Sequence, residues 1–145
     1  MSLSLKAGVE SFVMAASCQP YDSLRDLIES LSALLSGSRQ DVTVKWNGEP
    51  EEFDFRMKAE DNGVELVVVR YPNHRRRRGS IVFSFRGSKW DVCLPFWKEL
   101  RDLRIRAGVD VFESNWRRKF PQRELQQFTT LIRSLRREAR SKKIH

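Results

Sequence analysis

The sequence has few of the residues that build metal centres and nucleophilic sites. It contains two histidines and two cysteines among 145 residues. His74, His145, Cys18 and Cys93 lie far apart along the chain, without the close spacing that a zinc site needs. Neither histidine belongs to a Ser/His/Asp or Cys/His arrangement. The sequence therefore predicts no catalytic residue, no metal site and no cofactor.

Long apolar runs are also missing. Runs such as Leu66 to Val69 fall far short of the roughly 20 residues that a membrane-spanning helix needs. The N-terminus lacks the basic segment and apolar stretch that mark a secretory signal. We therefore expect a cytoplasmic protein without membrane insertion. Because cysteines in that compartment stay reduced, we expect no disulfide between Cys18 and Cys93.

The chain has enough apolar and aromatic material for a core of its own. Nine phenylalanines and four tryptophans argue against disorder, although 32% of the residues are charged. A chain of this length usually forms one domain and needs no disulfide to hold it. We expect a single domain over residues 1–145. Within it, residues 9–16 of the N-terminal segment 1–20 form either a short strand or a loosely docked arm, and residues 141–145 form a basic tail.

The net charge of +8 is concentrated near the C-terminus. Residues 1–100 contain 14 basic and 14 acidic side chains, whereas residues 101–145 contain 13 basic and 5 acidic ones. Such an excess suits an anionic partner, but it also occurs on an ordinary soluble basic surface.

The clearest element is a helix near the N-terminus. Asp22 or Ser23 can cap its first turn, and Gly37 ends it. Apolar residues recur between them at helical spacing and form one stripe, which consists of Leu24, Leu27, Ile28, Leu31, Leu34 and Leu35.

The apolar period then changes from 3.6 to 2, which predicts strands. Val42, Val44 and Trp46 alternate with polar residues, and turn residues 47–50 follow. In the next strand the apolar positions Phe53, Phe55 and Met57 alternate with Glu52, Asp54, Arg56 and Lys58. We therefore expect these charged side chains to face solvent. Glu49, Glu51, Glu52 and Asp54 are interpreted as a solvated strand edge and not as an acid–base or magnesium site.

Two further strands and the remaining helices complete the expected fold. Residues 64–71 are apolar on both faces around Leu66 to Val69 and should be central in the sheet, and residues 81–85 follow as a fourth strand. Pro95 should lie in the first turn of a helix that ends at Gly108, and the last helix should start at Phe120-Pro121. Residues 109–119 form either a short helix or a turn. The predicted fold is α+β, with an N-terminal helix, a four-stranded antiparallel meander, and two or three C-terminal helices on one sheet face.

Basic residues cluster in a loop and near the last helix. Clustered guanidinium groups grip phosphates, and a basic helix can lie along a nucleic-acid backbone. The alternative, which we favour for both segments, is a solvated charged surface. Trp116 and Phe120 either stack on bases or anchor two helices in the core. The candidates for binding an anionic partner are Arg75, Arg76, Arg77, Arg78, Arg117, Arg118, Lys119, Arg133, Arg136, Arg137 and Arg140.

One local sequence supports a resemblance. Trp46-Asn47-Gly48-Glu49-Pro50 forms a W-x-x-E-P turn before the alternating strand, and a late tryptophan, Trp116, precedes Phe120-Pro121. In this layout the chain resembles uncharacterised bacterial α+β domains, over about residues 22–135. Some families of that kind are suspected to be immunity or accessory proteins. The resemblance implies a bacterial origin and an interaction role, and it transfers no functional residue.

These observations favour a binding function over a catalytic one. The leading hypothesis is a non-enzymatic binding or accessory protein that acts through a protein-interaction surface on an unidentified protein partner. The alternative is a nucleic-acid-binding protein that uses the Arg75–Arg78 loop and the basic C-terminal helix.

Overall fold

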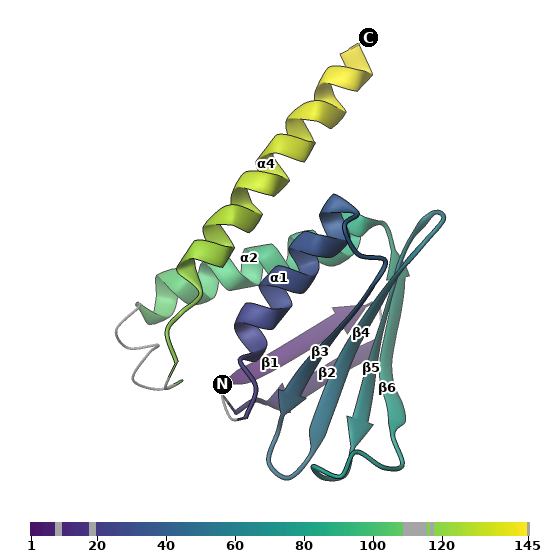
Figure 1. Cartoon of the computed structure of the whole chain (residues 1–145), viewed down its shortest axis with the longest axis vertical. Helices are drawn as coiled ribbons and strands as arrows, with labels where there is room; N and C mark the ends of the chain where they lie inside the picture. Colours follow the sequence, from purple (N-terminus) through teal and green to yellow (C-terminus); the bar gives the residue numbers. More distant parts are fainter. Residues whose placement is uncertain (8–9, 18–19, 109–115, 117, 145) are drawn as a thin grey trace.

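The computed structural model describes residues 1–7, 10–17, 20–108, 116 and 118–144 (Figure 1). The bounds of its elements are β1 (Ser2–Ala7), β2 (Glu10–Ala15), α1 (Ser23–Ser36), β3 (Asp41–Asn47), β4 (Glu52–Glu60), β5 (Gly63–Tyr71), β6 (Ser80–Gly87), α2 (Lys89–Ala107) and α4 (Gln122–Ile144). The α+β class is confirmed. The prediction that the fold starts with a helix is wrong, because two strands precede α1.

Strands β3 to β6 form one antiparallel sheet in chain order, as the short connections predict. Val44 lies opposite Phe55, and Phe55 lies opposite Val68, so neighbouring strands present apolar side chains on the same face. All three residues are fully buried. β5 lies between β4 and β6, which confirms the central place predicted for residues 64–71.

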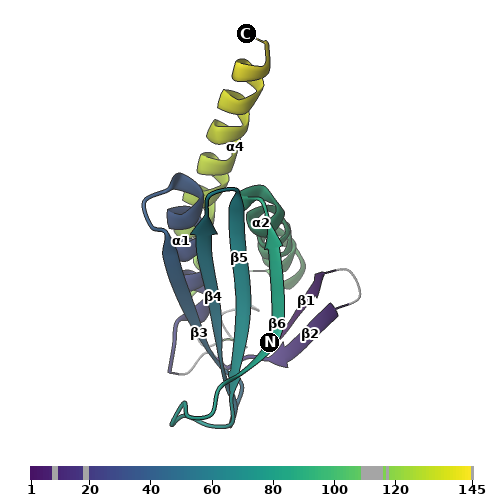
Figure 2. The same ribbon diagram turned by 90° about the vertical axis from the view of Figure 1, so that its right-hand side faces the viewer.

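The helices lie on one side of this sheet, as predicted (Figure 2). The apolar stripe of α1 is buried against the inner sheet face, with Leu27, Ile28, Leu31 and Leu34 at most 1% exposed. Each turn of α1 contributes at least one apolar residue to the stripe, so the helix buries a continuous face along its length.

The start of α1 differs from the expected cap. Asp22 occupies the N-cap position, but its side chain makes no capping hydrogen bond. Ser23 is the first helical residue, and its hydroxyl donates to the backbone carbonyl of Lys45 in β3. The serine therefore ties the helix to the sheet and does not close its own first turn. Gly37 ends the helix in the left-handed conformation, with φ of 80°, as predicted.

β1 and β2 form an antiparallel pair, the hairpin, that belongs to the core. β1 pairs with β2, and Ser17 bridges to Asn47 at the end of β3. Phe12, Met14 and Ala16 alternate along the second strand and are all buried. The ring of Phe12 meets the ring of Phe53 edge-on, at 5.2 Å between centroids. β2 confirms the short strand predicted over residues 9–16, and these buried contacts do not fit the alternative of a loosely docked arm.

Helix α2 begins earlier than predicted. Ser88 caps it, since its hydroxyl accepts from the backbone N–H of Asp91 while the Asp91 carboxylate accepts from the backbone N–H of Ser88. This reciprocal pair satisfies two backbone donors and fixes the start of the helix. Pro95 lies inside the helix, so its placement in the first turn is wrong. Gly108 follows the last helical residue, as expected.

Helix α4 is 23 residues long, or about 35 Å. Its first half packs on the body through Leu125, Phe128 and Ile132, which are at most 1% exposed. The second half leaves the body and projects away from it (Figure 1). Residues 141–144, expected to be a tail, continue this helix. Among the described residues, none of the helices has both the length and the apolar character needed to cross a membrane.

Candidate functional site

The arginine loop between β5 and β6 is fastened to the outer face of the sheet by Arg76. Its guanidinium forms ion pairs with the carboxylates of Glu52 and Asp54 on β4, and the pair with Glu52 measures 2.5 Å. The two carboxylate side chains are 4% and 7% exposed. The prediction that they face solvent is therefore wrong. They do point to the outer face, as the alternation requires, but the loop folds back and covers them.

Two tyrosines and a second arginine complete this buried cluster. The Tyr21 hydroxyl donates to Glu52 at 2.7 Å. The Tyr71 hydroxyl donates to Asp54 at 3.2 Å and accepts from Arg56 at 2.8 Å. Burial raises the pKa of Tyr21, and its hydrogen bond to the Glu52 carboxylate raises that pKa further. Since each carboxylate has several donors, the cluster is satisfied internally and offers no free acid or base.

The backbone of the loop supports the inward turn of Arg76. The Asn73 side chain accepts from the backbone N–H of Arg75, and the Asn73 carbonyl accepts from that of Arg76. Arg76 has a φ of 55°, in the left-handed region that few side chains adopt. Its guanidinium also lies over the Tyr71 ring, 4.6 Å from the centroid. A side chain at Gly79 would collide with Tyr71, so the loop needs glycine there to approach the sheet.

The other three loop arginines point outward. Arg75, Arg77 and Arg78 are exposed, and no carboxylate of the described residues forms an ion pair with them. The four-arginine run therefore has two roles. One guanidinium neutralises buried carboxylates, and three remain available to solvent or to an anion.

The basic residues before α4 contribute less than the sequence suggested. Arg117 lies outside the described residues. Arg118 donates to the backbone carbonyl of Pro20 at 3.3 Å, and Lys119 is exposed. Trp116 and Phe120 are 4% and 5% exposed. They are core residues that join helices, and the alternative of a base-stacking site is wrong for them.

The basic face of α4 is exposed. Arg133, Arg136, Arg137 and Arg140 all lie on the projecting half of the helix. This half and the arginine loop lie at opposite ends of the molecule (Figure 1). The structure therefore does not bring the two predicted clusters into one surface.

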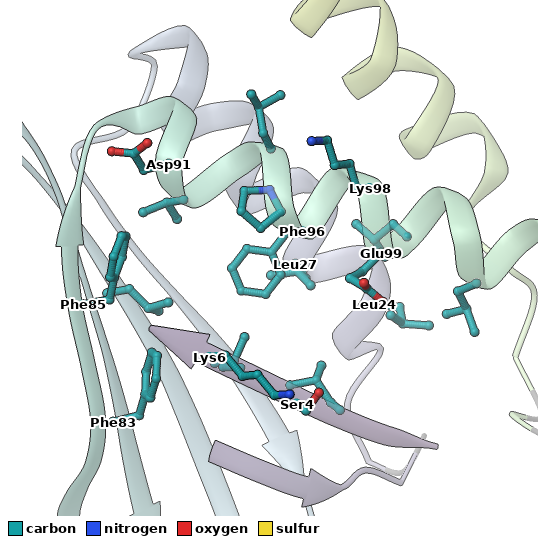
Figure 3. Close-up of a pocket in the computed structure, with 18 of the residues that line it drawn as sticks. Ser4, Lys6, Leu24, Leu27, Phe83, Phe85, Asp91, Phe96, Lys98 and Glu99 are labelled. Carbon is teal, nitrogen blue, oxygen red and sulfur yellow. The ribbon is translucent and has the colours of Figure 1, made fainter. Parts of the chain in front are cut away.

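A groove of about 930 Å³ opens between the hairpin, β6 and α2 (Figure 3). Its lining is mostly apolar, and its walls include Leu3 and Leu5 of β1, Phe83 and Phe85 of β6, and Leu94 and Leu103 of α2. Residues of α1 and β5 complete the lining, among them Leu24, Leu27 and Leu66. The side chains of Lys98 and Glu99 are exposed and lie along the same helix. Sequence reasoning missed this groove, because it needs the hairpin that β1 and β2 form.

The remaining chemically active residues are separated. Cys93 is a free, fully buried thiol, and burial raises its pKa to about 12, so it is a protonated thiol at neutral pH. His74 is exposed in the arginine loop. Among the described residues, no group of three or more histidine, cysteine, aspartate or glutamate side chains could hold a metal ion. Cys18 and His145 lie outside the described residues.

Comparisons with known proteins do not assign the chain to a family. No protein-family model, no curated protein and no solved structure matches the chain. The resemblance to uncharacterised bacterial α+β domains therefore stays a prediction.

Proposed function

We propose that this chain is a non-enzymatic binding or accessory protein that acts through a protein-interaction surface, the groove between β1, β6 and α2. The observation that supports the proposal is the apolar lining of that groove. Contiguous apolar surface open to water costs roughly 25 cal/mol per Å², and in soluble proteins it commonly marks an interaction site. A partner that covers the lining would remove this cost.

The strands beside the groove indicate what kind of segment would bind. Within the described residues, β6 pairs only with β5, and β1 pairs only with β2. β2 contacts part of β6, and the rest of β6, like β1, has an edge whose backbone N–H and C=O groups can pair with an added strand. We propose that the partner contributes an extended segment along β6, with apolar side chains at alternate positions that enter the groove.

A pair of variants on α2 tests this proposal. Leu94 is half-buried and lines the groove, whereas Ile105 is 75% exposed and does not line it. Leu94→Glu and Ile105→Glu introduce the same charge on the same helix. We expect Leu94→Glu to abolish capture of the cellular partner at gentle ionic strength, because a carboxylate would be buried without a partner. Ile105→Glu should capture it as the unaltered protein does.

Thermal unfolding followed by circular dichroism serves as the control for folding. Both variants should melt within a few degrees of the unaltered protein. If Leu94→Glu folds and still captures the same partner with the same yield, the groove is not the interaction surface. Equal loss in both variants would also contradict the proposal, since the effect would then come from charge on α2 in general.

A further inference from the structure

The projecting half of α4 is exposed to solvent, except at Leu135, which packs against the core. Leu135 is half-buried, and the other residues from Arg133 to Lys142 are exposed. Contacts that fasten α4 to the body come earlier, such as the hydrogen bond from the Trp97 indole to the Thr129 hydroxyl at 2.9 Å. A helix that no neighbour covers can enter a groove of a partner, which a helix packed along its length cannot do.

The charge of this segment is almost entirely positive. Between residues 133 and 142, Glu138 is the only acidic side chain beside five basic ones: Arg133, Arg136, Arg137, Arg140 and Lys142. Among the described residues no carboxylate forms an ion pair with any of these five. The arginine spacing of i, i+3, i+4 and i+7 places the guanidinium groups along one face. Their counter-charges therefore come from solution or from a partner.

The composition of the segment selects among anionic partners. A helix that lies on a membrane needs a wide apolar face, and the core of a protein interface is apolar and depleted of charge. Leu135 and Ala139 are the only apolar side chains between Arg133 and Lys142. A nucleic-acid backbone needs no apolar contact, because arginine and lysine bind its phosphates and release counterions.

The dimensions of the helix favour a DNA duplex. An α-helix with its side chains is about 10 to 12 Å across, and the major groove of B-form DNA is about 12 Å wide. The major groove of A-form RNA is too narrow to admit side chains. We propose that residues 133–142 of α4 lie in the major groove of duplex DNA and bind its phosphates. The contact is with the backbone, so it is independent of base sequence.

The arginine loop offers a matched control for this proposal. Arg133→Gln/Arg136→Gln/Arg140→Gln on α4 and Arg75→Gln/Arg77→Gln/Arg78→Gln on the loop remove the same charge from opposite ends of the molecule. All six side chains are exposed, so both variants should fold as the unaltered protein does. Leu94→Glu should leave DNA binding intact, which separates this proposal from that of the groove.

Fluorescence anisotropy with a labelled 20-base-pair DNA duplex, measured across salt concentrations, gives the decisive result. Log affinity falls as log salt rises, and the magnitude of this negative slope should be smaller by about 2.7 in the α4 variant. This is about 0.9 for each of the three phosphate contacts removed. The loop variant should keep the slope of the unaltered protein. An RNA duplex of the same sequence should bind more weakly than DNA.

Four outcomes would overturn the proposal. They are no binding to duplex DNA near 50 mM salt, an equal fall in slope for both variants, equal binding to the RNA duplex, and stronger binding to vesicles of anionic phospholipid than to DNA. The second would show that net charge alone drives binding, and the last would assign the segment to a membrane surface.

Discussion

Arg76 holds two buried carboxylates and one loop in place. Its side chain is 18% exposed, and the Glu52 and Asp54 side chains are almost fully buried. A buried charge without a partner is strongly unfavourable, so removing one member of such a cluster usually costs about 3 to 5 kcal/mol. Tyr21, Tyr71 and Arg56 would still contact the carboxylates and reduce this cost.

We predict that Arg76→Gln lowers the free energy of unfolding by about 3 kcal/mol, at the lower end of that range. The neighbouring variant Arg77→Gln removes the same charge from an exposed side chain and should change the free energy by less than about 0.5 kcal/mol. Urea unfolding followed by circular dichroism measures both values. Equal effects of the two variants would mean that the cluster around Arg76 does not stabilise the fold.

The burial of Glu52 and Asp54 shows a limit of sequence reasoning. Their alternation with Phe53 and Phe55 correctly places them on the outer face of the sheet. Whether that face is open depends on a loop that lies more than 20 residues later in the chain. The four arginines of that loop look equivalent in sequence, and only the folded loop shows that Arg76, whose backbone N–H donates to the Asn73 carbonyl, is the one that reaches the two carboxylates.

The hairpin of β1 and β2 is an element that contributes to the core. Phe12 is 8% exposed and lies against the rings of Phe53 and Phe55, with centroids 5.2 and 6.4 Å away. Val13, the next residue, points away from the core and is 66% exposed. Phe12 lies on the core-facing side of the strand and Val13 on its solvent-facing side, so substitutions at these two positions compare the two faces.

Phe12→Ala should lower the free energy of unfolding by about 3 kcal/mol or more, through lost apolar burial and the cavity that remains. Val13→Ala should cost no more than a few tenths of a kcal/mol, because its side chain is already in water. Both values come from chemical denaturation at equilibrium. If the two substitutions have similar small effects, the hairpin is not docked on the sheet in solution.

Elements with strong periodicity were predicted well, and elements with weak local signals were not. The stripe of α1 and the alternation in β3 and β4 locate these segments within a few residues. Pro95, as a first-turn residue, predicts a start of α2 that is too late, whereas the capping box of Ser88 and Asp91 sets the start. That S-x-x-D spacing is visible in the sequence and would have located it. The alternation of polar and apolar residues over Ser2–Ala7, followed by Gly8, is visible in the sequence and would have indicated the first strand of the hairpin.

The molecule as a whole consists of a packed body and a helix that extends beyond it (Figure 1). Phe128 and Ile132 are fully buried, whereas Arg137 and the residues after it that have a described side chain are exposed. The boundary between the stabilising and the non-stabilising part of α4 therefore falls between residues 132 and 137.

Two shortened chains test this boundary. A chain of residues 1–136 should have the same free energy of unfolding in urea as the full chain, within about 0.5 kcal/mol, because every side chain it loses that the structure describes is exposed. A chain of residues 1–127 lacks Phe128 and Ile132 and should be destabilised by several kcal/mol or fail to fold. If the longer chain is also destabilised, the projecting half of α4 contributes to folding in a way that its exposure does not explain.

The extension of α4 has a geometric consequence for any complex that forms on it. Residues 133–144 span about 18 Å at the rise of an α-helix. A rod of that reach holds its ligand away from the sheet and the hairpin, so the body of the protein remains open to a different molecule at the same time. If both proposed contacts form, the helix would separate the two bound molecules by about its own length.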